Sequence, residues 1–504
     1  MSEFDRPLFP VKDRLESFWL DQRDREVSNA RTTPHLPKSA DVVIIGSGMA
    51  GAMTAYQIYE EAKRKGRASP RVVMVEADET CGSATARNGG HCKPVTFLGY
   101  NTLKAKHGKD VANALLELEE GAMKIYGDVV EKEKIECDLH FTRSCDMFFD
   151  AADAERAKGD FEGRKADWPE IFAASNVQRV DSPEEIVKIT GVKGALWSAS
   201  YPAGHLWPYL LATSLIKICL KQGMNLQSYT PVLSIDPTSS SSSIVKTSRG
   251  NIPATLVIAA SNAYTGGFLP DFKDKIVPVR ATASAIKPSK SHSPAGIPGP
   301  LKYTYGFRWA QGDVDYLIPR QGRKIPGRGD RSIILGGAKS EFLKHHARWY
   351  GNINDNEEVP GVRGYFERFM PKVFAGWDGD ASNVQKVWTG VLGYSADFNP
   401  WVGLHPEQNG LMLCAGFTGH GMPLIPACSI AAAQLAIAYL EDKGTISPSA
   451  QATFEKTLPP PFRLTRKRYE AKVNVIKEYM GQGGNAQGAM QNTDEAVMLA
   501  RAKL

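Results

Sequence analysis

The chain has 504 residues, of which 42% are hydrophobic and 23% are charged, and its mean hydropathy is -0.29. This is the composition of a globular protein of two or three domains, and it excludes collagen-like, coiled-coil and wholly disordered chains. The formal net charge is +6, from 61 Lys and Arg against 55 Asp and Glu.

Most of the positive charge lies near the C-terminus. Residues 451–504 hold nine Lys or Arg against five Asp or Glu, an excess of +4. The densest run, 463–468, is short and has few aromatic neighbours. We therefore expect a solvated helix face there rather than a nucleic-acid or membrane patch.

Cysteine usage and hydropathy restrict the cellular setting. The seven cysteines form no Cys-x-x-Cys pair, which favours a reducing compartment and predicts neither a disulfide framework nor a metal site. No apolar signal stretch follows the first residues. Segment 408–440 contains no charged side chain, but its glycines and prolines predict a buried loop and a core helix rather than a membrane span.

The first elements predict an α/β fold. Residues 1–38 are expected to be a polar arm that carries Phe18, Trp19 and Leu20. An unbroken apolar run over 41–45, ending at a glycine, is typical of a central parallel strand. A helix over 51–65 and a second strand over 71–75 complete a strand–helix–strand unit.

Later segments alternate between helix and strand patterns. Apolar residues at spacings of three and four predict one long helix over 110–134, and a second helix is expected over 206–222. Strands are predicted over 228–235, 244–247 and 256–260.

The pattern changes after residue 275. Short strands over 276–286, 303–309, 316–319 and 332–336 are separated by loops over 289–300 and 322–330, which predicts an antiparallel sheet in a second domain. A buried strand over 411–415 and a helix over 427–440 follow, and 481–493 is expected to be flexible.

The strongest motif is Gly46-Ser47-Gly48-Met49-Ala50-Gly51, because it follows a buried strand and opens a helix. Its glycines permit a tight turn, close approach of a pyrophosphate and packing of the helix on the strand. The free N–H groups of the helix then face the phosphates. Glu76 ends the second strand and can accept both ribose hydroxyls of an adenosine, which argues against NADP.

Four ordered segments resemble the glycine oxidase/D-amino-acid oxidase (DAO) superfamily of FAD-dependent oxidoreductases. These are the small-residue segment from Cys81 to His91 after Glu76, the strand around Val232, the segment around Ala260, and the turn Gly416-Phe-Thr-Gly419-His420-Gly421-Met422. The form Arg87-Asn88-Gly89-Gly90 is most similar to the gamma-glutamylputrescine oxidoreductase-like branch.

The resemblance implies a cofactor site and a fold. The fold is an FAD-binding Rossmann-like domain of the glutathione reductase type, interleaved with an antiparallel-sheet substrate domain. The expected FAD domain comprises 39–105, 195–270 and 385–445, the substrate domain 106–194 and 271–384, and an extension 446–504. The motif and the resemblance together predict the cofactor-binding residues Gly46, Ser47, Gly48, Met49, Ala50, Gly51, Glu76, Ala77, Ser83, Ala84, Arg87, Asn88, Gly89, Gly90, Val232, Ala260, Gly416, Gly419, His420, Gly421 and Met422.

FAD is expected to be non-covalent. Asn88 stands where a related branch has its flavin-linking His, and 389–394 offers no Cys where sarcosine oxidases have one.

The predicted catalytic residues are His420, His91, Arg280, Arg308 and Tyr316. Arg280, Arg308 and Arg320 each suit a carboxylate, although each can equally be a surface charge of a sheet. His420 serves either as a donor to flavin or substrate or as a brace of its turn. His205 is expected to order a helix start.

The resemblance implies an amine or amino-acid oxidase: hydride passes from the substrate carbon to flavin N5, and molecular oxygen takes the electrons, giving hydrogen peroxide. The alternatives are an FAD dehydrogenase that feeds a carrier, a non-catalytic flavin protein and an NAD-dependent dehydrogenase. The ending Ala502-Lys503-Leu504 is a variant of the Ser-Lys-Leu address, which predicts a peroxisomal import receptor as partner and a peroxisomal enzyme. No nucleic acid and no membrane span are expected.

Overall fold

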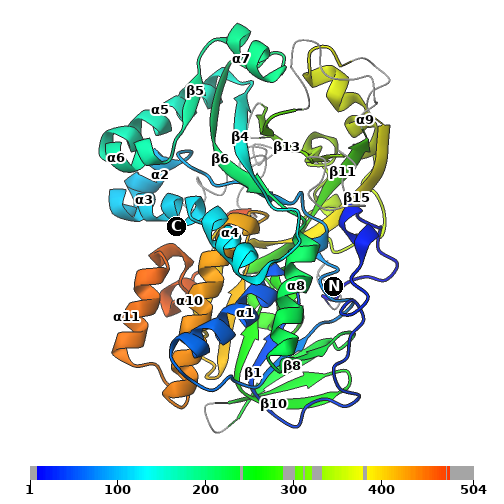
Figure 1. The fold of residues 1–504 in the computed structure, drawn as a ribbon, viewed down its shortest axis with the longest axis vertical. Helices are drawn as coiled ribbons and strands as arrows, with labels where there is room; N and C mark the ends of the chain where they lie inside the picture. Colours follow the sequence, from blue (N-terminus) through cyan, green and yellow to red (C-terminus); the bar gives the residue numbers. More distant parts are fainter. Residues whose placement is uncertain are drawn as a thin grey trace.

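The computed structural model describes residues 8–238, 242–287, 301–309, 313–320, 332–377, 383–472 and 474–476. The loops expected over 289–300 and 322–330, the stretch 481–493 and the C-terminal tripeptide lie outside the described residues. Two sheets organise the chain, one in the lower half and one in the upper half of Figure 1.

The first sheet is centred on β1 (Ala40–Ile45), whose apolar run is almost wholly buried as predicted. β1 pairs in parallel with β2 and β10, and β17 pairs in parallel with β10. The remaining pairings are β7 beside β2, β16 antiparallel to β17, and the ribbon β8–β9 on β10. The bounds of these strands are β2 Val72–Val75, β7 Asn225–Gln227, β8 Val232–Pro237, β9 Ser243–Thr247, β10 Gly250–Ala259, β16 Trp401–Leu404 and β17 Leu411–Ala415.

Three helices cover this sheet. α1 (Met49–Arg64) contacts both α8 (Pro208–Lys221) and α10 (Gly421–Glu441), and the three lie side by side in Figure 1. α11 (Pro448–Thr457) packs on α10. The arrangement is the α/β domain that the sequence predicts.

The second sheet has the order β15-β11-β14-β13-β12-β4-β6-β3, with β5 beside β6. Its pairings are antiparallel except for β12 and β4, which are parallel. Its strands are β3 His91–Cys92, β4 His140–Phe148, β5 Gln178–Val180, β6 Trp197–His205, β11 Ile276–Lys287, β12 Thr304–Arg308, β13 Val314–Pro319, β14 Ile333–Gly336 and β15 Asn383–Ser395. Further helices are α2 Tyr100–His107, α3 Lys109–Glu120, α4 Ala122–Glu133, α5 Ala151–Asp167, α6 Pro169–Ala174, α7 Pro183–Thr190 and α9 Val362–Val373. α5, α7 and α9 contact strands of this sheet, whereas α3 and α4 contact α10 of the first domain.

The segments expected for each domain differ from the sheets at three places. β3, β6 and β15 belong to the second sheet, although they fall within the segments expected for the FAD domain. A strand's apolar pattern shows that it is buried but not which sheet it joins. The two sheets are therefore connected several times by the chain.

Two helices differ from their predicted bounds. The helix expected over 110–134 is divided at Gly121, so that α3 ends and α4 begins on either side of it. The helix expected over 427–440 begins at Gly421, even though Pro423 and Pro426 follow. Proline is tolerated in the first helical turn, where N–H groups have no intrahelical acceptor.

Pro426 lies beyond that first turn and leaves the carbonyl of Met422 without its usual N–H donor. The hydroxyl of Tyr126, from α4, donates to this carbonyl at 3.0 Å. A buried carbonyl that loses its helical partner is thus satisfied by a side chain. α10 therefore continues through Pro426 to the turn at Gly419–Gly421.

α10 is long and apolar enough to span a membrane, and within the described ranges it is the one helix that is. The share of its most apolar window that is buried inside the protein is 78%. α10 therefore lies in the core, as the sequence predicts.

The basic run at 463–468 is in part the solvated helix face that the sequence predicts, because the helix over 466–470 has no buried residue and Arg466 and Lys467 are exposed. Arg463 and Arg468 of the same run are anchored to the protein. Arg468 donates to Asp397 at 2.8 Å and lies 3.8 Å from the ring centre of Trp401. Arg463 donates to the carbonyl of Leu458 at 2.8 Å. α12 (Arg466–Glu470) is held against the first sheet by these contacts. Asp397 and Trp401 are distant from Arg468 in the sequence, so a local pattern does not show that this arginine is anchored.

Candidate cofactor and active site

A cavity of about 300 Å³ lies between the two sheets. One end is lined by Gly46, Gly48 and Glu76 of the first sheet, and the other by Arg280, Tyr316 and Lys339 of the second. Pockets at the carboxyl ends of parallel strands are the usual ligand sites of open α/β sheets.

The three glycines of the turn after β1 have different roles. Gly46 has φ +105°, and a Cβ there would lie 2.8 Å from the carbonyl oxygen of Ala260. A Cβ on Gly51 would lie 2.0 Å from the carbonyl oxygen of Gly46. Gly48 has an ordinary φ of -65°, and a Cβ there would meet only Thr85 Oγ1, at 3.1 Å. Gly46 and Gly51 are thus required by the fold, whereas Gly48 leaves space in the cavity for a ligand.

Glu76 directly follows β2, and its carboxylate is fixed at the cavity wall. It accepts the N–H of Ser47 at 3.0 Å and the hydroxyl of Ser47 at 2.7 Å. Its second oxygen accepts the N–H of Asp78 at 3.1 Å. Ser47 itself does not line the cavity, so it orients Glu76 rather than a ligand. The arrangement presents a carboxylate suited to two neighbouring hydroxyls.

The segment after Glu76 runs along the cavity. Of the predicted positions, Ala77, Ser83, Ala84, Arg87, Asn88 and Gly89 line it. Gly90 does not, because it turns with φ +71° toward the carbonyl of Leu206. The guanidinium of Arg87 donates to the carbonyl of Thr389 at 2.9 Å, which ties this segment to β15.

The C-terminal turn places the start of α10 at the cavity. Gly419, His420, Gly421 and Met422 line it, and His420 is the N-cap of α10. Gly416 does not line the cavity, since its position faces Trp401. The side-chain oxygen of Asn262 accepts the N–H groups of Gly416 at 2.9 Å and Phe417 at 3.2 Å. A helix N-terminus and a fixed turn suit a group that gains negative charge.

His420 is held by a carboxylate from α3. Its Nε2 lies 2.8 Å from an oxygen of Glu119, which also accepts the N–H of Val95 at 2.8 Å. His420 therefore both braces its turn and faces the cavity, so the two predicted roles are compatible.

Four of the five predicted catalytic residues line the cavity, namely His91, Arg280, Tyr316 and His420, whereas Arg308 does not. Arg308 is 1% exposed and lies 3.1 Å from Asp146. Burial lowers the pKa of Arg280, whose guanidinium donates to the carbonyl of Glu357.

Arg320 and His205 lie away from the cavity. Arg320 pairs with Asp138. His205 ends β6, stacks on His140 at 5.0 Å and is 1% exposed, so it is a core histidine. The sequence predicts that His205 orders a helix start, but its ring packs on His140, and α8 begins three residues later at Pro208.

Tyr316 occupies space that two glycines leave. A Cβ on Gly89 would lie 2.3 Å from the Tyr316 ring, and one on Gly336 would lie 2.1 Å from it. Burial raises the pKa of the Tyr316 hydroxyl above its ordinary value. Its neutral hydroxyl is therefore a fixed part of the cavity wall.

Several residues that line the cavity were not predicted from the sequence. Lys93 lines the cavity, and its ammonium lies 2.9 Å from Asp146. Asp146 is fully buried and also accepts the hydroxyl of Tyr201 at 2.6 Å. Burial would raise the pKa of Asp146, but Arg308 and Lys93 outweigh it and hold that pKa below its usual range. Other unexpected lining residues are Lys339, Phe342, Leu343, Trp349, Leu8, Phe9 and Pro10.

Comparison with known families decides the assignment. The family model for FAD dependent oxidoreductases (DAO) matches residues 41–435. The chain belongs to the DAO family. It is therefore an FAD-dependent oxidoreductase, as the four motifs predict.

The relatives of this DAO-family chain are distant. It is 22% identical over 408 residues to a probable oxidoreductase OrdL of Rhizobium meliloti, covering 80% of this chain and 85% of that one. It is 25% identical over 248 residues to gamma-glutamylputrescine oxidoreductase of Escherichia coli, covering 49% and 53%. The crystal structure of glycine oxidase from Geobacillus kaustophilus aligns with a TM-score of 0.61 at 20% identity, covering 85% and 99%.

The residues present fit FAD. The space at Gly48, the start of α1 and the fixed carboxylate of Glu76 suit a pyrophosphate and a ribose. The same cavity continues to Gly89 and to the start of α10, where a flavin ring would meet the second sheet.

Proposed function

We propose that this chain oxidises the C–N bond of an amino acid or of another amine that carries a carboxylate, with molecular oxygen as electron acceptor. The observation that carries this proposal is the charge of the cavity wall. Arg280, Lys93 and Lys339 line it near the second sheet, and Glu76 is the one Asp or Glu among its described lining residues. A cationic wall favours an anionic substrate group over a polyamine.

Different residues of the cavity wall bind the substrate carboxylate and limit the size of the substrate. Arg280 and Lys93 bind the carboxylate, and Lys93 is kept in place by Asp146 and, behind it, by Arg308. Tyr316 and the apolar side chains Phe342 and Trp349 limit the size of the substrate. Bound FAD supplies the two-electron oxidation of the carbon that carries the nitrogen.

The overall reaction balances with oxygen and water. The amine loses two electrons and two protons to become an imine, and oxygen gains both as hydrogen peroxide. Water then hydrolyses the imine to a carbonyl compound and ammonia or a smaller amine. Names of relatives support this choice: glycine oxidase and gamma-glutamylputrescine oxidoreductase are named for such nitrogen compounds.

Paired substrates test the proposal. Anaerobic flavin reduction by glycine and other amino acids is compared with reduction by amines of the same size that lack a carboxylate. The carboxylated member of each pair is expected to reduce the flavin faster, and admitted oxygen to restore its colour with one hydrogen peroxide per turnover. Rapid reduction with slow reoxidation would instead favour a dehydrogenase that uses a carrier.

We also propose that FAD is non-covalent and that the enzyme is peroxisomal. The first rests on Asn88, which stands where a related branch links its flavin, and acid precipitation should release the flavin into solution. The second rests on Ala502-Lys503-Leu504. A reporter on the full chain should co-localise with catalase and should become diffuse when these three residues are deleted.

A further inference from the structure

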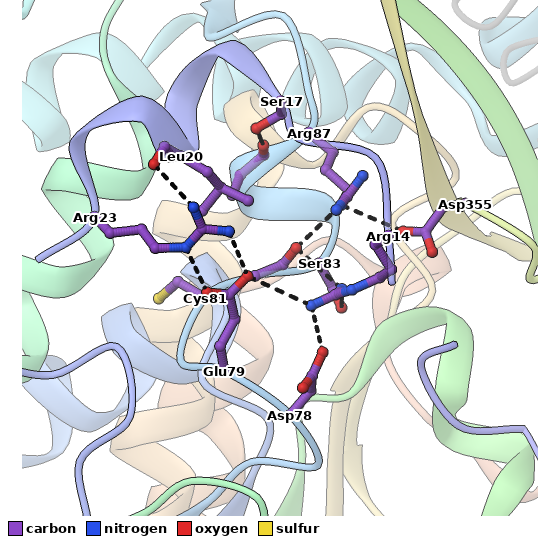
Figure 2. Close-up of polar contacts among 12 residues, drawn as sticks. Arg14, Ser17, Leu20, Arg23, Asp78, Glu79, Cys81, Ser83, Arg87 and Asp355 are labelled. Atoms are coloured by element: carbon purple, nitrogen blue, oxygen red, sulfur yellow. Dashed lines mark hydrogen bonds and ion pairs between the residues drawn. The ribbon is translucent and has the colours of Figure 1, made fainter. Parts of the chain in front are cut away.

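The N-terminal arm, here residues 8–23, lies along the outside of the cavity-lining segment 78–90. It runs from Leu8 to the short helix η1 (Phe18–Gln22). Figure 2 shows Arg14 of the arm directed at Asp78 and Ser83 of that segment, and Arg23 directed at Glu79. Leu8, Phe9 and Pro10 themselves line the cavity. The arm therefore packs on the outer side of segment 78–90 and also forms part of the cavity wall.

Side chains of the arm satisfy the backbone of this segment. The guanidinium of Arg14 donates to the carbonyl of Gly82 at 3.0 Å, and the hydroxyl of Ser17 to the carbonyl of Ala86 at 2.5 Å. The indole N–H of Trp19 donates to the carbonyl of Asn88 at 2.6 Å. The spacing of these three donors matches three carbonyls along 82–88. Because irregular buried backbone needs such partners, the arm fixes the path of the segment that lines the cavity.

The arm is also attached to the substrate side of the molecule. The N–H of Leu15 donates to the carbonyl of Asp355 at 3.0 Å. The carboxylate of Asp355 lies 3.3 Å from the guanidinium of Arg87, and both side chains are nearly fully buried. Arg14 also stabilises that carboxylate. One buried cluster thus joins the arm, the cofactor segment and the loop before α9, as Figure 2 shows.

Close contacts hold both ends of the arm against the protein. At one end a Cβ on Gly267 would lie 2.6 Å from the carbonyl oxygen of Leu8, so the arm passes directly over this glycine. At the other end Phe18 and Trp19 pack on Trp207, with ring centres 5.3 Å apart in each pair. Each ring buries a large apolar area.

We propose that the N-terminal arm is part of the cofactor site: it docks over the bound dinucleotide and thereby lowers the rate at which the dinucleotide dissociates. This proposal rests on the assignment of FAD to the cavity. With Leu8–Pro10 in the wall, a dinucleotide that enters or leaves has to displace the arm or the segment that the arm holds. Bound FAD and the docked arm therefore stabilise each other, as any ligand does for the conformation that it binds.

Dissociation of FAD from the purified holoenzyme tests this directly. Ser17→Ala removes one hydrogen bond and leaves the packing nearly unchanged, whereas Trp19→Phe removes one hydrogen bond and part of a buried ring. Ser17→Ala is expected to speed release of flavin, followed by its fluorescence on dilution, by about twofold to tenfold, and Trp19→Phe by at least as much. Arg25→Gln changes an exposed charge of the neighbouring turn and is the matched control, with an unchanged rate.

Proteolysis gives a second readout that is independent of activity. Trypsin should cut at Arg14 and Arg23 faster in the flavin-free full chain than in the holoenzyme, and added FAD should restore protection. Wild-type release rates in both folded variants, together with equal cleavage with and without FAD, would overturn the proposal. A wild-type chain that binds no FAD would instead remove the cofactor assignment on which it rests.

Discussion

The backbone of Gly51 packs so closely against Gly46 that a Cβ at position 51 would lie 2.0 Å from the carbonyl oxygen of Gly46. This contact holds α1 against the end of β1 with no ligand involved. Gly48, between them, has no comparable clash with the protein. We therefore expect a substitution at Gly51 to affect folding and a substitution at Gly48 to affect FAD binding.

Gly51→Ala should destabilise the fold, whereas Gly48→Val should fold and lose nearly all bound FAD. A Cβ at position 51 forces the helix off the strand, while one at position 48 fills the space left for the pyrophosphate. Thermal unfolding of both flavin-free chains and the flavin content of both preparations measure the contrast. Gly159→Ala, in α5 and in ordinary contact with Asn101, is the control. A yellow, fully loaded Gly48→Val protein would show that this turn is not the pyrophosphate site.

Glu76→Ala should weaken FAD binding without unfolding the protein. Two hydrogen bonds to a charged acceptor are lost, at roughly 1.5–3 kcal/mol each, so the Kd should rise at least tenfold. Ser47→Ala removes only the donor that orients Glu76 and should have a smaller effect in the same direction. Titration of the flavin-free chains with FAD measures both, and equal affinities for all three chains would contradict the role of Glu76.

Asp146→Asn should raise KM for a carboxylated substrate more than it lowers kcat. The change removes the charge that holds Lys93, while Asn keeps the size and one acceptor for Tyr201. Lys93→Met should raise KM similarly, and the double variant should be no worse than either single one, because both act on one group. Additive effects, or a loss of kcat alone, would show that Lys93 does not bind substrate.

His420→Ala should slow reduction of the flavin more than it lowers the melting temperature. His420 faces the cavity at the start of α10, and Glu119 holds it there. Glu119→Gln keeps a hydrogen-bonding partner for His420 and should retain more of the rate. Stopped-flow reduction and thermal unfolding distinguish the outcomes. If His420→Ala unfolds easily but its folded fraction is reduced at the normal rate, His420 is only a brace.

Stability should fall between pH 7 and pH 5 partly because of His205. Burial, with the neighbouring His140 and Arg320, lowers the pKa of His205 to about 3. The folded chain keeps this ring neutral, while the unfolded chain takes up a proton below its ordinary pKa of about 6.5, so acid favours unfolding. The expected loss over this interval is about 2 kcal/mol. Chemical denaturation of wild type and His205→Gln at both pH values should show the smaller drop in the variant, and parallel losses would contradict it.

Local patterns were enough for the cofactor end of the fold. The apolar run of β1, the glycines after it and Glu76 lie within 37 residues of one another, 40 to 76, and their roles follow from their own sequence. The residues of the cavity near the second sheet could not be predicted from local sequence patterns. Lys93, which follows β3, and Arg308 of β12 both pair with Asp146 of β4, and each of the three looks like an isolated charge in its own segment.

The start of α10 and the role of the arm were missed for physical reasons too. Pro426 marks a helix start by local rules, but Tyr126 from α4 replaces the missing donor and allows the helix to begin at Gly421. The arm's composition predicts a polar segment, and its contacts with the site are made with residues far along the chain, such as the carbonyls of 82–88 that accept from Arg14, Ser17 and Trp19.

In the proposed function, the FAD-bound enzyme oxidises a carboxylated amine and passes the electrons to oxygen. The visible spectrum of the purified protein during an anaerobic titration with amino acids, followed by admission of oxygen, tests both steps. We expect a yellow protein that bleaches with a carboxylated amine and regains its colour with release of hydrogen peroxide. A colourless protein that binds NADH, or a yellow one that no amine or amino acid bleaches, would contradict it.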